Sequence, residues 1–135
     1  MEMSIFFPVK VPSKKNNKQI FRLPNGNPFI TSSKSHKTWH AGMITGLKQL
    51  KIDTLGDATF TECAVSIELY DRRKHRYDLS NKAETLLDAL VDAGILLDDN
   101  RRVVYRLTIA DMTPVNTGCE DGWYVFIDGK TGVAP

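Results

Sequence analysis

The segment from Arg72 to Arg102 constrains the chain most, because it places a basic run, a short helix and a pair of acids in close succession. The basic run consists of Arg72, Arg73, Lys74, His75 and Arg76. Asp78 and Asn81 follow it, and the pair Asp98–Asp99 stands near the end of the segment. Charges on both sides of the helix make this segment the first candidate for a functional site.

A short amphipathic helix is predicted from Asn81 to Ala93. Asn81 is a suitable N-cap residue, and Glu84 stands three residues later, as in a capping box. The apolar positions at helical spacing are Ala83, Leu86, Leu87, Leu90 and Gly94. The polar positions of the opposite face are Asn81, Glu84, Thr85, Asp88 and Asp92.

Gly94 is the expected end of this helix, because glycine readily adopts the left-handed conformation found after a last helical turn. The apolar residues Ile95–Leu97 would then return the chain along the apolar side, which could bring Asp98 and Asp99 near Asp78. Carboxylates that lie close together repel one another, and a divalent cation removes that penalty. Oxygen ligands without an accompanying Cys or His set favour Mg²⁺ or Mn²⁺ over zinc.

The basic run beside these acids suits a polyanion as the ligand. Acids, a cation and a polyanion together indicate metal-assisted hydrolysis of a phosphodiester. Simpler interpretations stand beside this one. Acids on the outer face of a helix are often only solvated, Glu84 could serve only as a cap, and Asp-Asp-Asn is a common turn sequence.

The run D-L-S-N-K-A-E-T-L-L-D-A-L, followed by G-I-L-L-D-D and V-Y-R, resembles the core signature of the RusA-type Holliday-junction resolvases. The motif lies within residues 78–106. The resemblance implies a homodimer that uses Mg²⁺, or Mn²⁺, to cut four-way DNA junctions by paired symmetric nicks. It implies metal-binding roles for Asp78, Asp98 and Asp99, and supporting roles for Asn81 and Asp88.

Two positions depart from the best-known pattern of that family. Ser80 stands where the pattern has a second Asp, and Glu84 stands where it has a Lys. If the activity is kept, Glu84 replaces the missing carboxylate as a metal ligand and Lys82 supplies the positive charge. Without that compensation the protein would bind junctions and not cut them.

Basic residues outside the acidic motif are predicted to hold DNA phosphates without reading sequence. They are Lys14, Lys15, Lys18, Arg72, Arg73, Lys74 and Arg76, with Arg101 and Arg102 as weaker candidates beside the acids. The loop that holds Lys14 and Lys15 could equally be a solvated turn.

The order of predicted elements is strand, hairpin, helix, strand, helix, strand, strand, which is typical of an α+β fold. We expect a single domain over residues 1–135, with two helices packed on a mixed sheet. The predicted strands are Ser4–Phe7, Ile20–Leu23, Pro28–Thr31, Thr59–Tyr70, Val103–Ile109 and Gly122–Ile127, and the first helix runs from about Lys37 to Leu50. An Asn-Gly pair at 25–26 predicts the hairpin turn, and a slip near Glu62 predicts a β-bulge.

Composition adds few constraints. The net charge of +2 does not by itself indicate nucleic-acid binding, so the prediction depends on local clusters. Cys63 and Cys119 show no metal-binding spacing, Cys63 fits a core position, and the absence of a signal peptide or apolar span favours a cytoplasmic protein without a membrane segment. His36 and His40 are four apart but lack a third ligand.

Three other functions remain open on the sequence alone. The first is a junction- or single-strand-binding protein with a degenerate site. The second is an interaction protein whose acidic helix docks a partner. The third is a metal nuclease that acts on another branched DNA.

Overall fold

The structure is a computed structural model that describes residues 1–12, 18–22, 28–32, 34–73, 75–115 and 118–134, with backbone only for 18–22, 28–32 and 34–36. The elements in chain order are β1 (Glu2–Phe7), β2 (Lys18–Arg22), β3 (Pro28–Ser32), α1 (Lys34–Leu55), β4 (Ala58–Tyr70), α2 (Leu79–Asp92), β5 (Val104–Asp111), the 3₁₀ helix η1 (Thr113–Val115) and β6 (Gly122–Val133). This is the predicted order. The predicted Asn-Gly turn lies outside the described residues.

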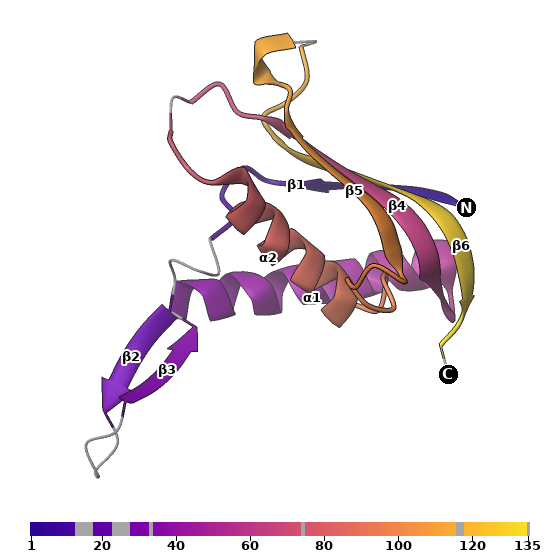
Figure 1. The fold of residues 1–135 in the computed structure, drawn as a ribbon, viewed down its shortest axis with the longest axis horizontal. Helices are drawn as coiled ribbons and strands as arrows, with labels where there is room; N and C mark the ends of the chain where they lie inside the picture. Colours follow the sequence, from indigo (N-terminus) through magenta and orange to yellow (C-terminus); the bar gives the residue numbers. More distant parts are fainter. Residues whose placement is uncertain (13–17, 23–27, 33, 74, 116–117, 135) are drawn as a thin grey trace.

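Four strands form a mixed sheet in the order β1-β6-β4-β5. β4 and β5 are parallel, whereas β1 pairs with β6 and β6 pairs with β4 in antiparallel fashion. Both helices lie on one side of this sheet (Figure 1). The α+β prediction with two helices on a mixed sheet is therefore confirmed, and the β2–β3 hairpin forms a separate two-stranded sheet.

Alternating side chains build the core between the sheet and the helices. β1 alternates exposed and buried residues along its whole length, and β4 does so over most of its length. Val65 and Ile67 of β4 and Trp123 of β6 are almost fully buried, as are Leu86 and Leu90 on the apolar face of α2. Burial of one face of the sheet and one side of each helix fixes how these elements pack.

The connection from β4 through α2 to β5 positions the sequence motif. Because β4 and β5 are parallel, the chain must return along the sheet between them, and α2 provides that return. Gly94, with φ 81°, follows the last turn of α2 and redirects the chain toward β4. The next residues then pair with the first part of β4: Phe60 N donates to Ile95 O at 2.9 Å, and Leu97 N donates to Phe60 O at 3.0 Å. The start and the end of α2 consequently lie at opposite ends of β4 (Figure 1).

Several predicted boundaries were wrong. α1 continues to Leu55, where a polar connection was expected, because Leu55 is buried in the core. α2 begins at Leu79, not Asn81, because Asp78 is the residue that caps it. β6 continues through Gly129 to Val133, whereas the last strand was expected to end at Ile127.

Gly129 explains the length of β6. The register of β4 against β6 shifts between Phe60 and Glu62, which confirms the predicted bulge. At this bulge the β4 backbone lies so close to Gly129 that a Cβ atom there would overlap Glu62 O and the Cα atom of Cys63. Glycine therefore permits close approach of two strands here, which is one of its recurrent uses within strands.

Two other results concern single features. Cys63 is buried in the core, as predicted, and burial raises the pKa of its thiol to about 11. Within the described ranges, no helix combines the length and the apolar character that crossing a membrane requires.

We expect Gly129→Ala to lower the free energy of unfolding by about 2 kcal/mol or more, because either strand must move to admit the methyl group. Gly132→Ala is the matched control in the same strand, since its Cβ would meet only Thr61 Cγ2 at an ordinary 3.6 Å. Urea denaturation of both variants measures the difference. Equal stability of the two variants would contradict the close approach at the bulge.

Candidate functional site

Asp78 occupies the N-cap of α2. Its carboxylate accepts hydrogen bonds from Ser80 N at 2.9 Å and from Ser80 Oγ at 2.6 Å. Ser80 stands where the RusA-type pattern has a second Asp, and its hydroxyl donates a hydrogen bond to Asp78. The side chain of Asp78 is exposed at the surface, so the cap leaves it accessible to a ligand.

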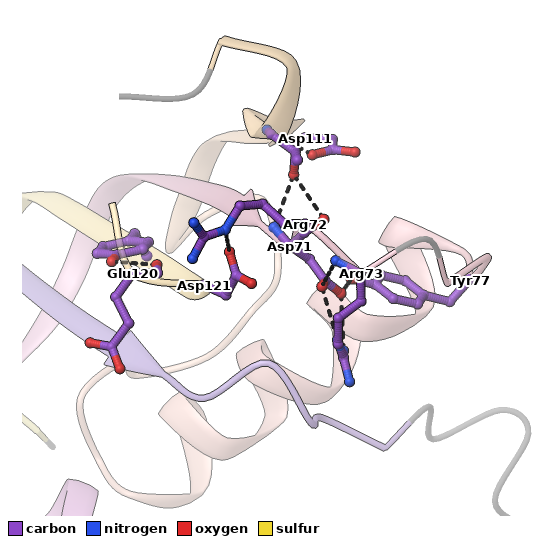
Figure 2. A network of polar contacts seen from close by, with 9 residues as sticks. Asp71, Arg72, Arg73, Tyr77, Asp111, Glu120 and Asp121 are labelled. Atoms are coloured by element: carbon purple, nitrogen blue, oxygen red, sulfur yellow. Dashed lines mark hydrogen bonds and ion pairs between the residues drawn. The ribbon is translucent and has the colours of Figure 1, made fainter. Parts of the chain in front are cut away.

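Asp71 anchors the segment that leads into α2. Its carboxylate is buried and accepts from Arg73 N at 3.0 Å, Arg73 Nε at 2.9 Å, Arg73 Nη2 at 3.0 Å and Tyr77 Oη at 2.7 Å. Figure 2 shows Arg73 and Tyr77 converging on this carboxylate. Asp71 N also donates to Thr113 Oγ1 at 2.9 Å, which ties the segment to η1.

The charges in this network follow from these contacts. Hydrogen bonds from Arg73 hold the pKa of Asp71 below its usual value, against the opposing effect of burial. Burial and the hydrogen bond to Asp71 raise the pKa of Tyr77. The network therefore keeps Asp71 ionised and Tyr77 protonated at neutral pH.

The rest of the basic run is arranged around this anchor. Arg72 Nε donates to Asp121 Oδ1 at 3.0 Å, on the opposite side of the segment from Arg73 (Figure 2). His75 and Arg76 are exposed. Lys74 lies outside the described residues. The side chains that the sequence assigned to DNA phosphates are therefore at the surface, but Arg72 and Arg73 are already paired with acids.

Lys82 and Thr85 connect α2 to the chain after β1. Lys82 Nζ donates to Val11 O and lies 5.4 Å from the centre of the Tyr77 ring, and Thr85 Oγ1 donates to Pro12 O at 2.9 Å. Burial, with the charge of Arg73, lowers the pKa of Lys82. Lys82 is thus held in place beside the basic segment.

The paired acids lie at the other end of α2. Asp99 N donates to Asp98 Oδ1 at 2.7 Å and Asn100 Nδ2 donates to Asp98 Oδ2 at 3.0 Å, so this Asp-Asp-Asn run does form a side-chain-stabilised turn. The pKa of Asp99 is raised by partial desolvation, by a hydrogen bond with Asp98, and by the negative charges of Asp98 and Asp88. Asp98 and Asp99 are in direct contact, and Asp88 is near enough for its charge to act on Asp99. We call these three residues the acidic turn cluster.

Asp78 does not lie near this cluster. Asp88 stands ten residues after Asp78 along α2, about 15 Å at 1.5 Å per residue, and Asp98 and Asp99 follow the end of that helix. The expectation that the return after Gly94 brings Asp98 and Asp99 near Asp78 is therefore wrong within one chain, because Ile95–Leu97 pair with the start of β4 and not its end. In the part of the chain that the structure describes, no three His, Cys, Asp or Glu side chains are grouped so that they could hold a metal ion.

The remaining predicted residues are distributed as follows. Glu84 is exposed on α2 and Asn81 is partly buried, while Arg101 and Arg102 are exposed beside the acidic turn cluster. Lys14 and Lys15 lie outside the described residues, and Lys18 is described only as backbone in β2.

His40 contacts an acid of the other helix. Its Nε2 lies 2.7 Å from Asp92 Oδ2, which connects α1 to α2. The side chain of His36 is not among those that the structure describes.

Sequence reasoning did not identify Asp71, Tyr77 or Thr85. Asp71 directly follows a strand that is buried on one face, and an arginine stands two residues later, which is a pattern that favours a buried ion pair. Thr85 lay among the predicted polar positions of the helix, but it is fully buried because its hydroxyl is satisfied by Pro12 O. These three residues shape the site, although none of them is among the residues on which the resemblance to the RusA-type resolvases rests.

No protein-family model matches this chain, and no curated protein has a significantly similar sequence.

The Asp71 network predicts a pH-dependent contribution to stability. A carboxyl whose pKa is lower in the folded chain stabilises the fold above its unfolded pKa and loses that contribution as the pH falls through the folded value. We expect Asp71→Asn to lower the free energy of unfolding at pH 7 by about 2–3 kcal/mol, with a smaller deficit below about pH 4. Urea denaturation at several pH values tests this, with the exposed Asp57→Asn as control.

The acidic turn cluster predicts a perturbed titration. The carboxyl of Asp99 should titrate above the ordinary range for Asp, and Asp98→Asn should lower its pKa by removing a like charge and a shared hydrogen bond. Carboxyl carbon NMR shifts followed against pH measure both effects, with the exposed Asp53→Asn as control. An Asp99 pKa that does not respond to Asp98→Asn would show that the two carboxyls do not interact.

Proposed function

We propose that this protein is a divalent-metal-dependent endonuclease that resolves four-way DNA junctions as a homodimer in the cytoplasm. The motif of the RusA-type resolvases supports this, and so does its placement on α2. Asp78 stands at the first turn beside the basic segment 72–76, and Asp98 and Asp99 of the acidic turn cluster stand beyond the last turn. This placement of acids and cations at the two ends of one helix is the observation on which the proposal depends.

The separation of the acids specifies what a dimer must do. Asp78 does not share a ligand site with Asp98 and Asp99 of its own chain, because about 15 Å of α2 separates it from Asp88, whose charge acts on Asp99. In a two-fold dimer with the two α2 helices antiparallel, Asp78 of one protomer approaches the acidic turn cluster of its partner. Two-fold symmetry repeats this arrangement, which provides two sites for two strands.

The donor set fits a hard cation only in that assembly. Carboxylate oxygens suit Mg²⁺ or Mn²⁺, and the residues in question are Asp78, Glu84, Asp98 and Asp99, with Asp88 as a supporting acid. When bound, such a cation would neutralise the carboxylates and lower the pKa of the attacking water. Phosphates of the junction arms would rest on Arg72, Arg73, Arg76 and Arg101, with Lys14, Lys15, Lys18 and Lys74 as further candidates from the sequence.

Lys82 is held by the protein and is not a mobile side chain free to move to the reacting phosphate. Its Nζ already donates to Val11 O and lies over the Tyr77 ring. An ammonium group has three donors, so it retains donors for a phosphate oxygen while the protein holds it in position. We therefore assign Lys82 to phosphate binding next to Asp78.

A junction-binding protein without nuclease activity is the second candidate. Two observations favour it. The carboxylate of Asp78 caps α2 and accepts hydrogen bonds from Ser80. Within one chain, the described residues also contain no group of three side chains that could hold a metal ion. This candidate predicts tight junction binding without cutting in either metal.

Cleavage of a synthetic four-way junction tests the proposal. We expect paired symmetric nicks with Mg²⁺ or Mn²⁺, none in EDTA, and none on a linear duplex of the same sequence. Asp78→Asn and Asp99→Asn should each lower cutting by at least a hundredfold while junction binding and the fold persist, and the exposed Asp57→Asn should cut normally. Normal cutting by either of the first two variants would refute the site.

Mixing the two inactive variants tests the arrangement of the site. If each site uses Asp78 from one protomer and Asp99 from the other, a heterodimer of Asp78→Asn with Asp99→Asn contains one intact site. The mixture should then recover single-strand nicking and bind Mn²⁺, as followed by electron paramagnetic resonance, where neither variant alone does so. No recovery with an active wild-type protein would show that each site lies within one chain.

A further inference from the structure

A hollow of about 400 Å³ lies between the chain after β1, the first half of α1 and the start of α2. Its charged and aromatic lining residues are Lys10, Trp39, Arg73, His75, Tyr77 and Lys82. The volume falls within the range of roughly 300–1,000 Å³ that is usual for small-molecule sites. The hollow is distinct from the acidic turn cluster, which lies at the other end of α2.

The charge of the hollow favours an anion. Lys10, Arg73 and Lys82 bring positive charge and His75 a further ring nitrogen, while none of the described residues that line it is acidic. Asp71 neutralises part of the charge of Arg73 from behind, through the paired hydrogen bonds of the guanidinium group. Lys10 and Lys82 are left as the cations of the hollow without a carboxylate partner among its lining.

Two aromatic rings are fixed in its wall. The Trp39 ring centre lies 6.5 Å from that of Phe7, and the Tyr77 ring centre lies 6.2 Å from that of Trp123. Tyr77 is also held by its hydrogen bond to Asp71. Rings that are held in place by the core provide a flat surface at little entropic cost to a ligand.

The wall formed by residues 9–12 is also fixed before any ligand arrives. Three side chains donate to backbone oxygens of residues 9–12: Trp123 Nε1 to Val9 O at 3.3 Å, Lys82 Nζ to Val11 O, and Thr85 Oγ1 to Pro12 O at 2.9 Å. The hollow is therefore preformed and not created by closure around a ligand.

We propose that this hollow receives one unpaired nucleotide of a DNA strand, with its base against Trp39 and its phosphate on Lys10 and Lys82. Aromatic walls bind the face of a base and ammonium groups bind its phosphate, so the lining matches both halves of a nucleotide. A base inside a duplex has both faces covered by stacking, so it cannot enter a hollow of this size while paired. This inference rests on the proposed function, because a branch point supplies nucleotides that leave the stack at low cost.

Binding to bulged duplexes in EDTA tests the inference without cutting. One duplex carries a single unpaired thymidine, a second carries an abasic residue at the same place, and a third is fully paired. Wild-type protein should bind the thymidine bulge about tenfold more tightly than the abasic bulge, because only the former has a base to stack. Trp123 is fully buried, so quenching of tryptophan fluorescence by the thymidine bulge should disappear in Trp39→Phe.

Two substitutions separate the base from the phosphate. Trp39→Ala should remove the preference for the thymidine bulge over the abasic bulge. Lys10→Gln should lower the affinity for both bulged duplexes by a similar factor of about three to ten. Lys48→Gln is the control for charge, since Lys48 is exposed about two and a half turns further along α1. Trp39 also packs on Phe7, so Lys10→Gln still tests the site even if Trp39→Ala folds poorly.

Three outcomes would overturn the inference: equal affinity for the two bulges, unchanged binding by Lys10→Gln, or a free mononucleotide that binds as tightly as the bulge. Junction cleavage by the same preparation separates this result from the proposed function. Cutting without a preference for the unpaired base refutes only the nucleotide site. A preference that Trp39→Ala removes, in a protein that never cuts, supports the nucleotide site and refutes the nuclease.

Discussion

Parallel pairing of β4 with β5 is the constraint on which the arrangement of this protein depends. Parallel neighbours require a return of the chain along the sheet, and α2 supplies it with an apolar face that includes the buried Leu86 and Leu90. The return places the cap residue Asp78 and the turn at Asp98–Asp99 at opposite ends of the sheet. A motif that is compact in sequence is therefore spread along one helix in space, and burial of that helix keeps its two ends apart.

The buried carboxylate of Asp71 has a comparable effect on the basic end. Without it, the polar connection after β4 would be held mainly by the contact of Arg72 with Asp121. Four hydrogen bonds to Asp71 instead fix Arg73 and Tyr77, and Tyr77 in turn packs near Trp123 and beneath Lys82. One ionised group in the interior thus determines how an arginine, a lysine and an aromatic ring face the hollow. Positive charge there depends on a negative charge behind it.

The sequence predicted the order of elements, the fold class and the bulge near Glu62, because alternation and helical spacing report which side of each element is buried. It misplaced the ends of elements where a tertiary contact decides them. β6 passes through Gly129 because β4 approaches there, and α1 runs on to Leu55 because the core accepts that residue. The predicted cap was Asn81 and the observed cap is Asp78. The reason is local, because the backbone N–H and the hydroxyl of Ser80 both donate to Asp78. The distance between Asp78 and Asp99 depends on which strand end Ile95–Leu97 join, and no local pattern encodes that pairing.

Charge along α2 connects the proposed dimer to the proposed nucleotide site. Each chain carries cations around the first turn of α2 and acids beyond the last, so two antiparallel copies of α2 would set the basic end of each against the acidic end of the other. That orientation sets Lys82 and Arg76 near the partner's acids, but it also sets Asp78 against them, so a bound cation would offset the repulsion between the carboxylates. A strand whose unpaired nucleotide occupied the hollow of one protomer would then continue directly toward the acidic turn cluster of its partner. The hollow would position the strand and the acids would hold the cation that acts on it, so neither end of α2 would be sufficient alone.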